Sequence, residues 1–301
     1  MNSIDKLISL ANVRGSLDLR CQFQGDWARD HEQEVLGKAP YHVVLKGECR
    51  VEFPDGQRLP MRAGDILLLP RGAPHILHSV GKTVAPSTPS LVANTPLPLY
   101  RIGGVTADLD MLCGGFHYNR TSLLFAALPE HLVIPSAALP ASAPLPALVE
   151  MLRGEADSEQ AGAHYLLDAL SQALFTWILR AHLASHGQHT GTLALLSDQR
   201  LGRAWQSMLE DPAHEWTVDA LADIASMSRA TFMRAFVRVA GVSPWALLTQ
   251  VRMELAFNLL SHSHLGLNDI AAQVGYQSQA AFSKKFKETY GEAPGRVRRG
   301  L

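Results

Sequence analysis

The sequence has few cysteines and no long hydrophobic run, and both absences limit its class. Three of its 301 residues are cysteine, namely Cys21, Cys49 and Cys113. A sparse, odd-numbered set argues against a disulfide-stapled secreted domain and favours a reducing cytoplasm. No stretch reaches the length of apolar sequence that a membrane span needs. The first residues also lack the apolar block of a signal peptide. We therefore expect a cytoplasmic protein with no membrane partner.

An excess of charge of either sign is also missing from the chain as a whole. Lysine and arginine total 27 and aspartate and glutamate total 28, which leaves a net charge of −1. The hydrophobic fraction of 47% is ordinary for a globular protein. Because single cores rarely grow beyond about 250–300 residues, this length predicts two domains. Basic side chains gather at the end of the chain, at Lys284, Lys285, Lys287, Arg296, Arg298 and Arg299.

An internal repeat in the last third of the chain is its most informative feature. The pattern F-x3-F-x4-G-x-[S/A]-P occurs at Phe232–Pro244 and again at Phe282–Pro294. Each copy is preceded by the tripeptide Asp-Ile-Ala. Self-similarity of this kind indicates one supersecondary unit used twice. In each copy the pattern predicts a helix, a turn and a second helix that glycine ends and proline follows.

The second helices of the two copies are expected at about 229–240 and 278–290, with a linking helix over 245–260. A helix-turn-helix places its second helix in the major groove of DNA. The phenylalanines must face the core, so the opposite face is displayed. Arginine and glutamine there can contact base edges, while lysine neutralises phosphate. The candidate DNA-binding residues are Arg229, Ala230, Met233, Arg234, Arg238, Gln279, Ala280, Ser283, Lys284 and Lys287.

The segments ALADIASMS, FVRVAGVSP, RMELAFNLL and DIAAQVGYQSQAAFSKKFKETYGEAP resemble the AraC/XylS family of transcription regulators over about 201–300. This resemblance implies that the two recognition helices read successive major grooves. It places Met233, Arg234, Gln279 and Lys284 at base-contacting positions. The partners expected from it are double-stranded DNA, RNA polymerase and a second copy of the chain, with no enzymatic activity.

A second motif lies in the first half, where Gly64-x5-Pro70-x-Gly72-x2-His75 matches the second cupin motif. The first cupin motif should supply His-x-His and a glutamate, but only His42 is present, followed by Gly47 and Glu48. The match predicts a cupin-like β-barrel, or jelly roll. The incomplete ligand set leaves two hypotheses open, a zinc or copper site or hydrogen-bonded and ligand-contacting core histidines. The histidines in question are His42, His75 and His78.

The segments LISLANVRGSLDLRCQFQGDW and LLFAALPEHLVI, with Cys113-Gly114, resemble an AraC-family subgroup of activators that sense reactive chlorine species. The resemblance implies that Cys21 and Cys113 are redox cysteines that respond to hypochlorous acid. This chain departs from the subgroup by an insertion at roughly 81–105. Arg20 or a barrel histidine could lower the pKa of the Cys21 thiol. The competing interpretation is that Cys21 is a small buried hydrophobic residue. Cys49 is expected in the core.

These observations predict an α+β chain, with a cupin-like β-barrel followed by an all-α double helix-turn-helix domain. The expected domains are a sensor barrel at 1–120, a helical linker at 121–195 and a DNA-binding domain at 196–301. The long striped helix at 161–185 either packs on a domain or forms a dimer seam. The predicted function is a sequence-specific transcription activator that is switched by thiol oxidation. The alternatives are a regulator that responds to an organic ligand or metal, and a cupin metalloenzyme fused to a DNA-binding domain.

Overall fold

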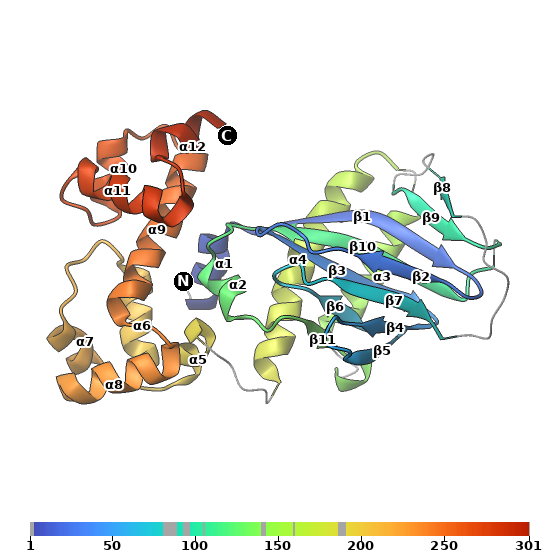
Figure 1. Cartoon of the computed structure of the whole chain (residues 1–301), viewed down its shortest axis with the longest axis horizontal. Coiled ribbons are helices and arrows are strands. Elements are labelled where there is room, and N and C mark those ends of the chain that lie inside the picture. The colour runs from blue at the N-terminus through green and yellow to red at the C-terminus, as the bar shows by residue number, and fades with distance from the viewer. Residues whose placement is uncertain are drawn as a thin grey trace. The chain divides into compact units, whose positions relative to one another are not determined.

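The computed structural model describes residues 3–80, 89–92, 97–104, 106–139, 143–158, 160–185 and 191–300. The chain forms two compact units, one built mainly from strands and one built from helices (Figure 1). The strand unit joins Val13–Tyr118 to Pro129–Gly187. The helical unit joins Met1–Asn12 and Asn119–Leu128 to Gln188–Leu301. Among the described residues, no helix is long and apolar enough to cross a membrane.

These units divide the chain differently from the expected boundaries at 120 and 195. The helix α1 (Ser3–Ala11) and the short helix α2 (Leu123–Ala127) belong to the helical unit and pack on each other. The helices α3 (Pro144–Ala156) and α4 (Ala163–Ala184), expected in a separate linker, belong to the strand unit. Sequence order alone could not show which core each of these segments joins.

The strand unit contains two sheets that enclose one core. The larger sheet contains β1 (Arg14–Phe23), β3 (Lys38–Lys46), β6 (Ile66–Leu68), β8 (Ser90–Val92), β9 (Leu99–Ile102), β10 (Leu109–His117) and β11 (Leu132–Ile134). The smaller sheet contains β2 (Ala28–His31), β4 (Glu48–Glu52), β5 (Arg58–Arg62) and β7 (His75–Ser79). The expected α+β class with an N-terminal cupin-like domain is confirmed. Strands β8 and β9 lie within the insertion, of which 81–88, 93–96 and 105 fall outside the described residues.

Strand order in the larger sheet is β11-β6-β3-β10-β1-β9-β8, and in the smaller sheet it is β2-β7-β4-β5. The pairing of β1 with β10 is antiparallel, as is that of β10 with β3. Successive side chains of a strand point to opposite faces of its sheet. In β3, Tyr41 and Val43 therefore share one face, and His42 and Val44 share the other. The core between the sheets includes Val44 and Met111 from the larger sheet.

Helix α4 covers the outer face of the larger sheet. The Tyr41 hydroxyl lies 3.0 Å from Ser171 Oγ of α4, and Phe116 contacts Phe175 with ring centroids 5.2 Å apart. A Cβ atom at Gly15 would approach the Ser171 carbonyl carbon to 2.6 Å, so only glycine allows this close packing of helix on strand. Of the two interpretations of the striped helix, packing on a domain is the one observed.

The helical unit repeats one helix-turn-helix design twice. Its remaining helices are α5 (Gly191–Ser197), α6 (Leu201–Glu210), α7 (Val218–Ile224), α8 (Arg229–Ala240), α9 (Pro244–His262), α10 (Leu267–Gln273), α11 (Gln279–Tyr290) and α12 (Pro294–Gly300). Ser228 and Ser278 cap α8 and α11 by accepting backbone N–H groups of the first turn. Both helices end at a glycine in the left-handed conformation, Gly241 with φ 75° and Gly291 with φ 79°. The expected second helices and their end signals are confirmed.

Polar contacts hold the segment 119–128 to α9 and α11. Glu254 of α9 accepts the backbone N–H of Leu123 at 2.7 Å. The Asn119 amide donates to the Tyr290 hydroxyl at 3.0 Å, and Gln250 Nε2 donates to the Thr121 carbonyl at 2.6 Å. Buried polar groups normally have such partners because losing one costs about 1–3 kcal/mol. These bonds make 119–128 an integral part of the helical unit.

Candidate functional site

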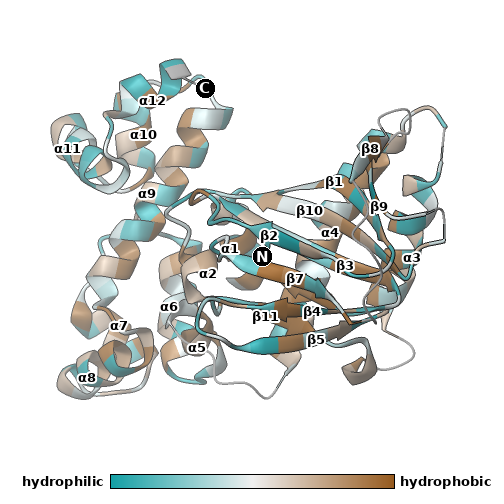
Figure 2. Ribbon diagram, turned by 45° about the vertical axis from the view of Figure 1, so that its right-hand side comes forward, coloured by the Kyte–Doolittle hydropathy of each residue, from teal (hydrophilic) through white to brown (hydrophobic). Residues whose placement is uncertain are grey.

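The displayed faces of α8 and α11 form the candidate DNA-binding surface. Phe232, Phe236, Phe282 and Phe286 are fully buried, and the burial pattern along the two helices is the same residue by residue. Figure 2 shows hydrophobic and hydrophilic residues on each helix, as a helix with one core face requires. The predicted contact residues are all exposed or partly exposed. Those fully on the surface are Arg229, Ala230, Arg234, Arg238, Gln279, Ala280, Lys284 and Lys287.

The two helices differ in how they present charge. Helix α8 carries three arginines and no acidic residue, whereas α11 carries Lys284, Lys285 and Lys287 with Glu288. Lys285 forms an ion pair with Glu288 at 3.3 Å, and Arg229 forms one with Asp219 at 3.4 Å. Exposed pairs of this kind contribute little to stability and can rearrange to contact phosphate. Met233 and Ser283 are half-buried at the edges of the surface.

Inside the strand unit, Cys21 of β1 faces Cys113 of β10. Their sulfur atoms lie 3.6 Å apart, although the backbone partners are Cys21 with Met111 and Leu19 with Cys113. The pair is therefore diagonal across two antiparallel neighbours, on the face that points into the core. Cys21 lies within β1, the first strand of the larger sheet. Cys21 is only 5% exposed and Cys113 is somewhat more accessible.

Three histidines continue the row of polar side chains that begins at the two cysteines. His42 Nδ1 lies 3.2 Å from Cys113 Sγ, and His42 Nε2 lies 3.0 Å from His75 Nε2. The ring of His31 stacks on that of His75, with centroids 4.5 Å apart. We call Cys21, Cys113, His42, His75 and His31 the thiol–histidine cluster. It draws on strands of both sheets, β1, β3 and β10 of the larger and β2 and β7 of the smaller.

Burial determines the protonation state of the cluster. The pKa of His42 lies well below its ordinary value because the ring is desolvated and the other two histidines are close. Desolvation also lowers the pKa of His75 to about 4, and it lowers that of His31. The pKa of Cys113 is raised by its hydrogen bond with Cys21 and by burial. At neutral pH the cluster therefore holds neutral imidazoles, and Cys113 is a protonated thiol.

Arg20 does not lie beside the redox thiols, contrary to the expectation from the sequence. Arg20 follows Leu19 on β1 and points to the face opposite Cys21. There it forms an ion pair with Asp110 at 2.7 Å and another with Asp157. Cys49 behaves as expected, since it is fully buried in the core and burial raises its pKa to about 12.

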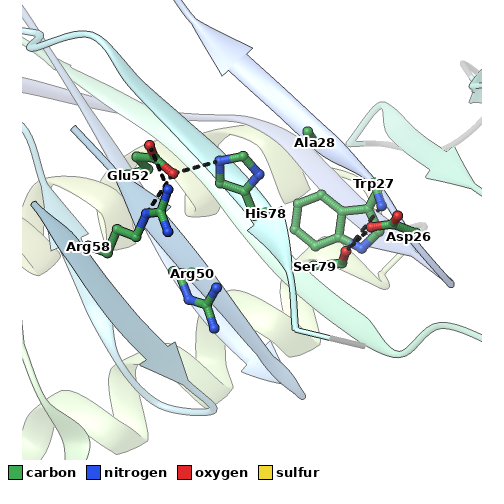
Figure 3. A pocket seen from close by; sticks show the side chains of 8 residues that line it. All are labelled: Asp26, Trp27, Ala28, Arg50, Glu52, Arg58, His78 and Ser79. Atoms are coloured by element: carbon green, nitrogen blue, oxygen red, sulfur yellow. Dashed lines mark hydrogen bonds and ion pairs between the residues drawn. The ribbon is translucent and has the colours of Figure 1, made fainter. Parts of the chain in front are cut away.

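Of the three histidines predicted to form a ligand site, the structure brings together His42 and His75 but not His78. His78 alternates with Leu77 on β7 and points to the outer face of the smaller sheet (Figure 3). There it lines an open pocket of about 440 Å³ and lies 3.4 Å from a carboxylate oxygen of Glu52, which also pairs with Arg58. His31 takes the place that the sequence interpretation gave to His78.

His31 was missed because its segment carries no clear strand pattern. The run ARDHEQEV is polar, and only the pairing of β2 with β7 places His31 directly opposite His75. That pairing joins strands far apart in the chain, and no local periodicity reports it. The sequence around His31 therefore carries no local signal that this residue joins the cluster.

Comparison with known proteins agrees with both units. A family model described as cupin matches residues 3–184, and one described as a helix-turn-helix domain matches residues 221–300. An uncharacterized HTH-type transcriptional regulator of Haemophilus influenzae is 36% identical over all of this chain and 99% of its own length. The HTH-type transcriptional regulator MtrA of Neisseria gonorrhoeae is 32% identical, covering 99% of this chain and 98% of the relative. The RCS-specific HTH-type transcriptional activator RclR of Escherichia coli is 30% identical, covering 99% and 97%.

Proposed function

The chain belongs to the AraC-type family of transcription regulators with a cupin domain, and we propose that it is an activator switched by reversible oxidation of Cys21 and Cys113. It binds DNA through its helix-turn-helix domain and is not an enzyme, as its full-length relatives are named regulators. The alternative of a fused cupin metalloenzyme is thereby set aside. The observation that carries the switch is the 3.6 Å separation of two core-facing sulfur atoms on adjacent strands.

The proposed reaction needs little movement of the chain. A disulfide has an S–S bond of about 2.05 Å, so the sulfur atoms must approach by roughly 1.5 Å. Hypochlorous acid converts one thiol to a sulfenyl chloride and releases water. The second thiol then displaces chloride and loses its proton, which leaves the Cys21–Cys113 disulfide. Cys113 is the less buried residue of the pair and is the proposed site of first attack. A dithiol reductant reverses the reaction by thiol–disulfide exchange.

The burial of Cys113 bears on which oxidants can act. Thiolate is the form that attacks peroxide, and a raised pKa keeps the thiolate population low. A stronger electrophilic oxidant is therefore the better fit to this pair than hydrogen peroxide. This agrees with the name of the Escherichia coli relative, which assigns that protein to reactive chlorine species.

Mass spectrometry of the full-length protein tests the proposed reaction. After about one equivalent of hypochlorous acid, a linked peptide containing Cys21 and Cys113 should appear and should vanish with dithiothreitol. Cys49 should remain alkylatable only after unfolding. Oxidised protein that contains sulfonate at either cysteine but no linked peptide would contradict the switch.

We further propose that the regulator acts in the cytoplasm, as a homodimer, and through RNA polymerase. The exposed face of α4 offers one surface for a second copy, since Tyr165 is 81% and Leu166 49% exposed. Apolar side chains exposed side by side are typical of interaction surfaces. Sedimentation of the purified protein with and without operator DNA would test the dimer. The variant Tyr165→Lys, Leu166→Lys should be monomeric.

Arg234→Ala is expected to weaken binding to the cognate site by about 1–3 kcal/mol while changing non-specific binding little, because an exposed arginine on a recognition helix reads base edges. Lys287→Ala should instead weaken binding to all sequences and reduce the salt dependence by about one unit. Fluorescence anisotropy on specific and random duplexes at several salt concentrations measures both effects. Arg153→Ala, on α3 of the strand unit, is the matched control. If Arg234→Ala loses the same affinity for the specific and the random duplex, Arg234 does not contact base edges.

A further inference from the structure

Three imidazoles from three strands converge inside the barrel. His31 lies on β2, His42 on β3 and His75 on β7, and their potential ligand atoms all lie within 4.8 Å of one another. His42 and His75 are each only 3% exposed, and His31 is partly exposed. Isolated buried histidines usually face a backbone or side-chain partner. Here two of the rings also direct a nitrogen atom at each other.

The hydrogen bonds of His75 and His42 indicate how these nitrogens are protonated. His75 Nδ1 lies 3.1 Å from the carbonyl oxygen of Ala73, which can only accept. The proton of neutral His75 is therefore on Nδ1, and its Nε2 carries a lone pair. That lone pair lies 3.0 Å from His42 Nε2. Either His42 Nε2 donates its proton to that lone pair, or both nitrogen atoms bind one metal ion.

The surroundings of both rings are those of metal ligands. A ligating histidine almost always donates its second ring N–H to a carbonyl or another acceptor, which fixes the orientation of the ring. The Ala73 carbonyl oxygen is the partner of His75 Nδ1, and the Cys113 sulfur, 3.2 Å away, is the partner of His42 Nδ1. Three imidazoles leave a coordination position open, as in other three-histidine zinc sites.

We propose that His31, His42 and His75 bind one late first-row transition-metal ion, with Zn²⁺ as the simplest occupant, and that its affinity depends on the oxidation state of Cys21 and Cys113. The first part stands on the three histidines alone. The second part rests on the proposed oxidation switch. The metal site differs from the one that the sequence predicted, because His31 replaces the outward-facing His78.

The link between metal and thiols runs through one hydrogen bond. When the disulfide forms, the Cys113 sulfur moves toward Cys21 and becomes a poorer acceptor for His42 Nδ1. His42 then loses the contact that holds its ring in place, and the loss of such a supporting contact typically weakens metal binding 10–100-fold. Because linkage is reciprocal, bound metal opposes disulfide formation by the same factor.

Metal content and affinity of the reduced full-length protein test the site. Equilibration with Zn²⁺ followed by gel filtration should leave one Zn²⁺ per chain by mass spectrometry, and Co²⁺ should give a visible ligand-field absorption that Zn²⁺ removes. His31→Ala, His42→Ala and His75→Ala should each lower the affinity at least tenfold. His78→Ala is the matched control, since it removes an imidazole from the same strand as His75 but from the outer face. It should bind like the wild type.

Folding of the variants is checked by thermal melting in EDTA, and His31→Gln provides a milder change at the partly exposed position. Wild-type protein with well under one Zn²⁺ per chain, or histidine variants that bind as tightly as His78→Ala, would overturn the site.

To test the link, the protein is oxidised with diamide before titration, with Cys21→Ser as the form that cannot cross-link. Zn²⁺ affinity should fall about tenfold or more on oxidation of the wild type and stay constant in Cys21→Ser. If the oxidised wild type contains the disulfide but binds Zn²⁺ as tightly as the reduced wild type, the link is overturned and the metal site is not. Zn²⁺ binding without disulfide formation would instead contradict the oxidation switch.

Discussion

Serine in place of Cys113 is expected to abolish oxidant-dependent activation of a target promoter, and Cys21→Ser is expected to do the same. Each change removes one of two sulfur atoms that lie 3.6 Å apart and leaves the other without a thiol partner on the neighbouring strand. A hydroxyl cannot form a disulfide, and serine is close to cysteine in size. The pairing of β1 with β10 should therefore persist. Operator binding by the reduced variants should match that of the wild type.

A reporter strain exposed to sublethal hypochlorous acid measures the response, and anisotropy measures the binding. Cys49→Ala is the matched control, because Cys49 lies on β4 of the other sheet, is fully buried and has a pKa raised to about 12. It should respond to the oxidant like the wild type. Full activation in the Cys21→Ser, Cys113→Ser double variant would rule out the thiol pair as the sensor.

The helical unit could be predicted from the sequence in detail because its signals are local. Capping serines, terminal glycines and phenylalanines one turn apart all act within a few residues of the helix that they define. The expected helix at 229–240 matches α8 in its bounds, and the one at 278–290 matches α11 to within one residue. What local signals could not show is that α1 and 119–128 complete this unit, because Asn119, Leu123 and Thr121 find their partners more than a hundred residues away.

The barrel cluster was predictable only in part, for a related reason. The cupin motif gives the turn before His75, and alternation gives the inward direction of His42. The position of a side chain within a sheet also depends on which strands pair and in what register, and a shift of one residue reverses every face. The outward directions of Arg20 and His78 follow from alternation along β1 and β7, whereas the place of His31 opposite His75 follows from the pairing of β2 with β7. The raised pKa of Cys113 likewise depends on its hydrogen bond with Cys21 and on burial, which no spacing reveals.

The second large effect is expected at Glu254, where pH should control the stability of the helical unit. Glu254 is fully buried in α9, with one carboxylate oxygen bonded to Leu123 N–H and the other lacking a hydrogen-bond partner among the described residues. Burial raises its pKa from 4.5 to about 8, while the bond from Leu123 lowers it only in part. The folded chain thus holds a proton that the unfolded chain releases above pH 4.5. Stability should therefore fall as the pH rises from about 4.5 through 8 and should level off above that.

Glu254→Gln keeps an acceptor oxygen for Leu123 and removes the charge, so this decline should disappear. One pKa unit corresponds to 1.36 kcal/mol, and the advantage of the variant at pH 9 over that at pH 5 should be on the order of 4 kcal/mol. The unpartnered NH₂ of glutamine adds a cost of about 1–2 kcal/mol at every pH, so the change with pH is the readout. Thermal melting of both proteins from pH 5 to 9 gives the comparison, with the exposed Glu292→Gln as control. Melting temperatures that stay parallel across this range would show that Glu254 is ionised in the fold. Its contact with Leu123 would then be a charged one, and the segment 119–128 would be held to α9 by that charge and not by a neutral hydrogen bond.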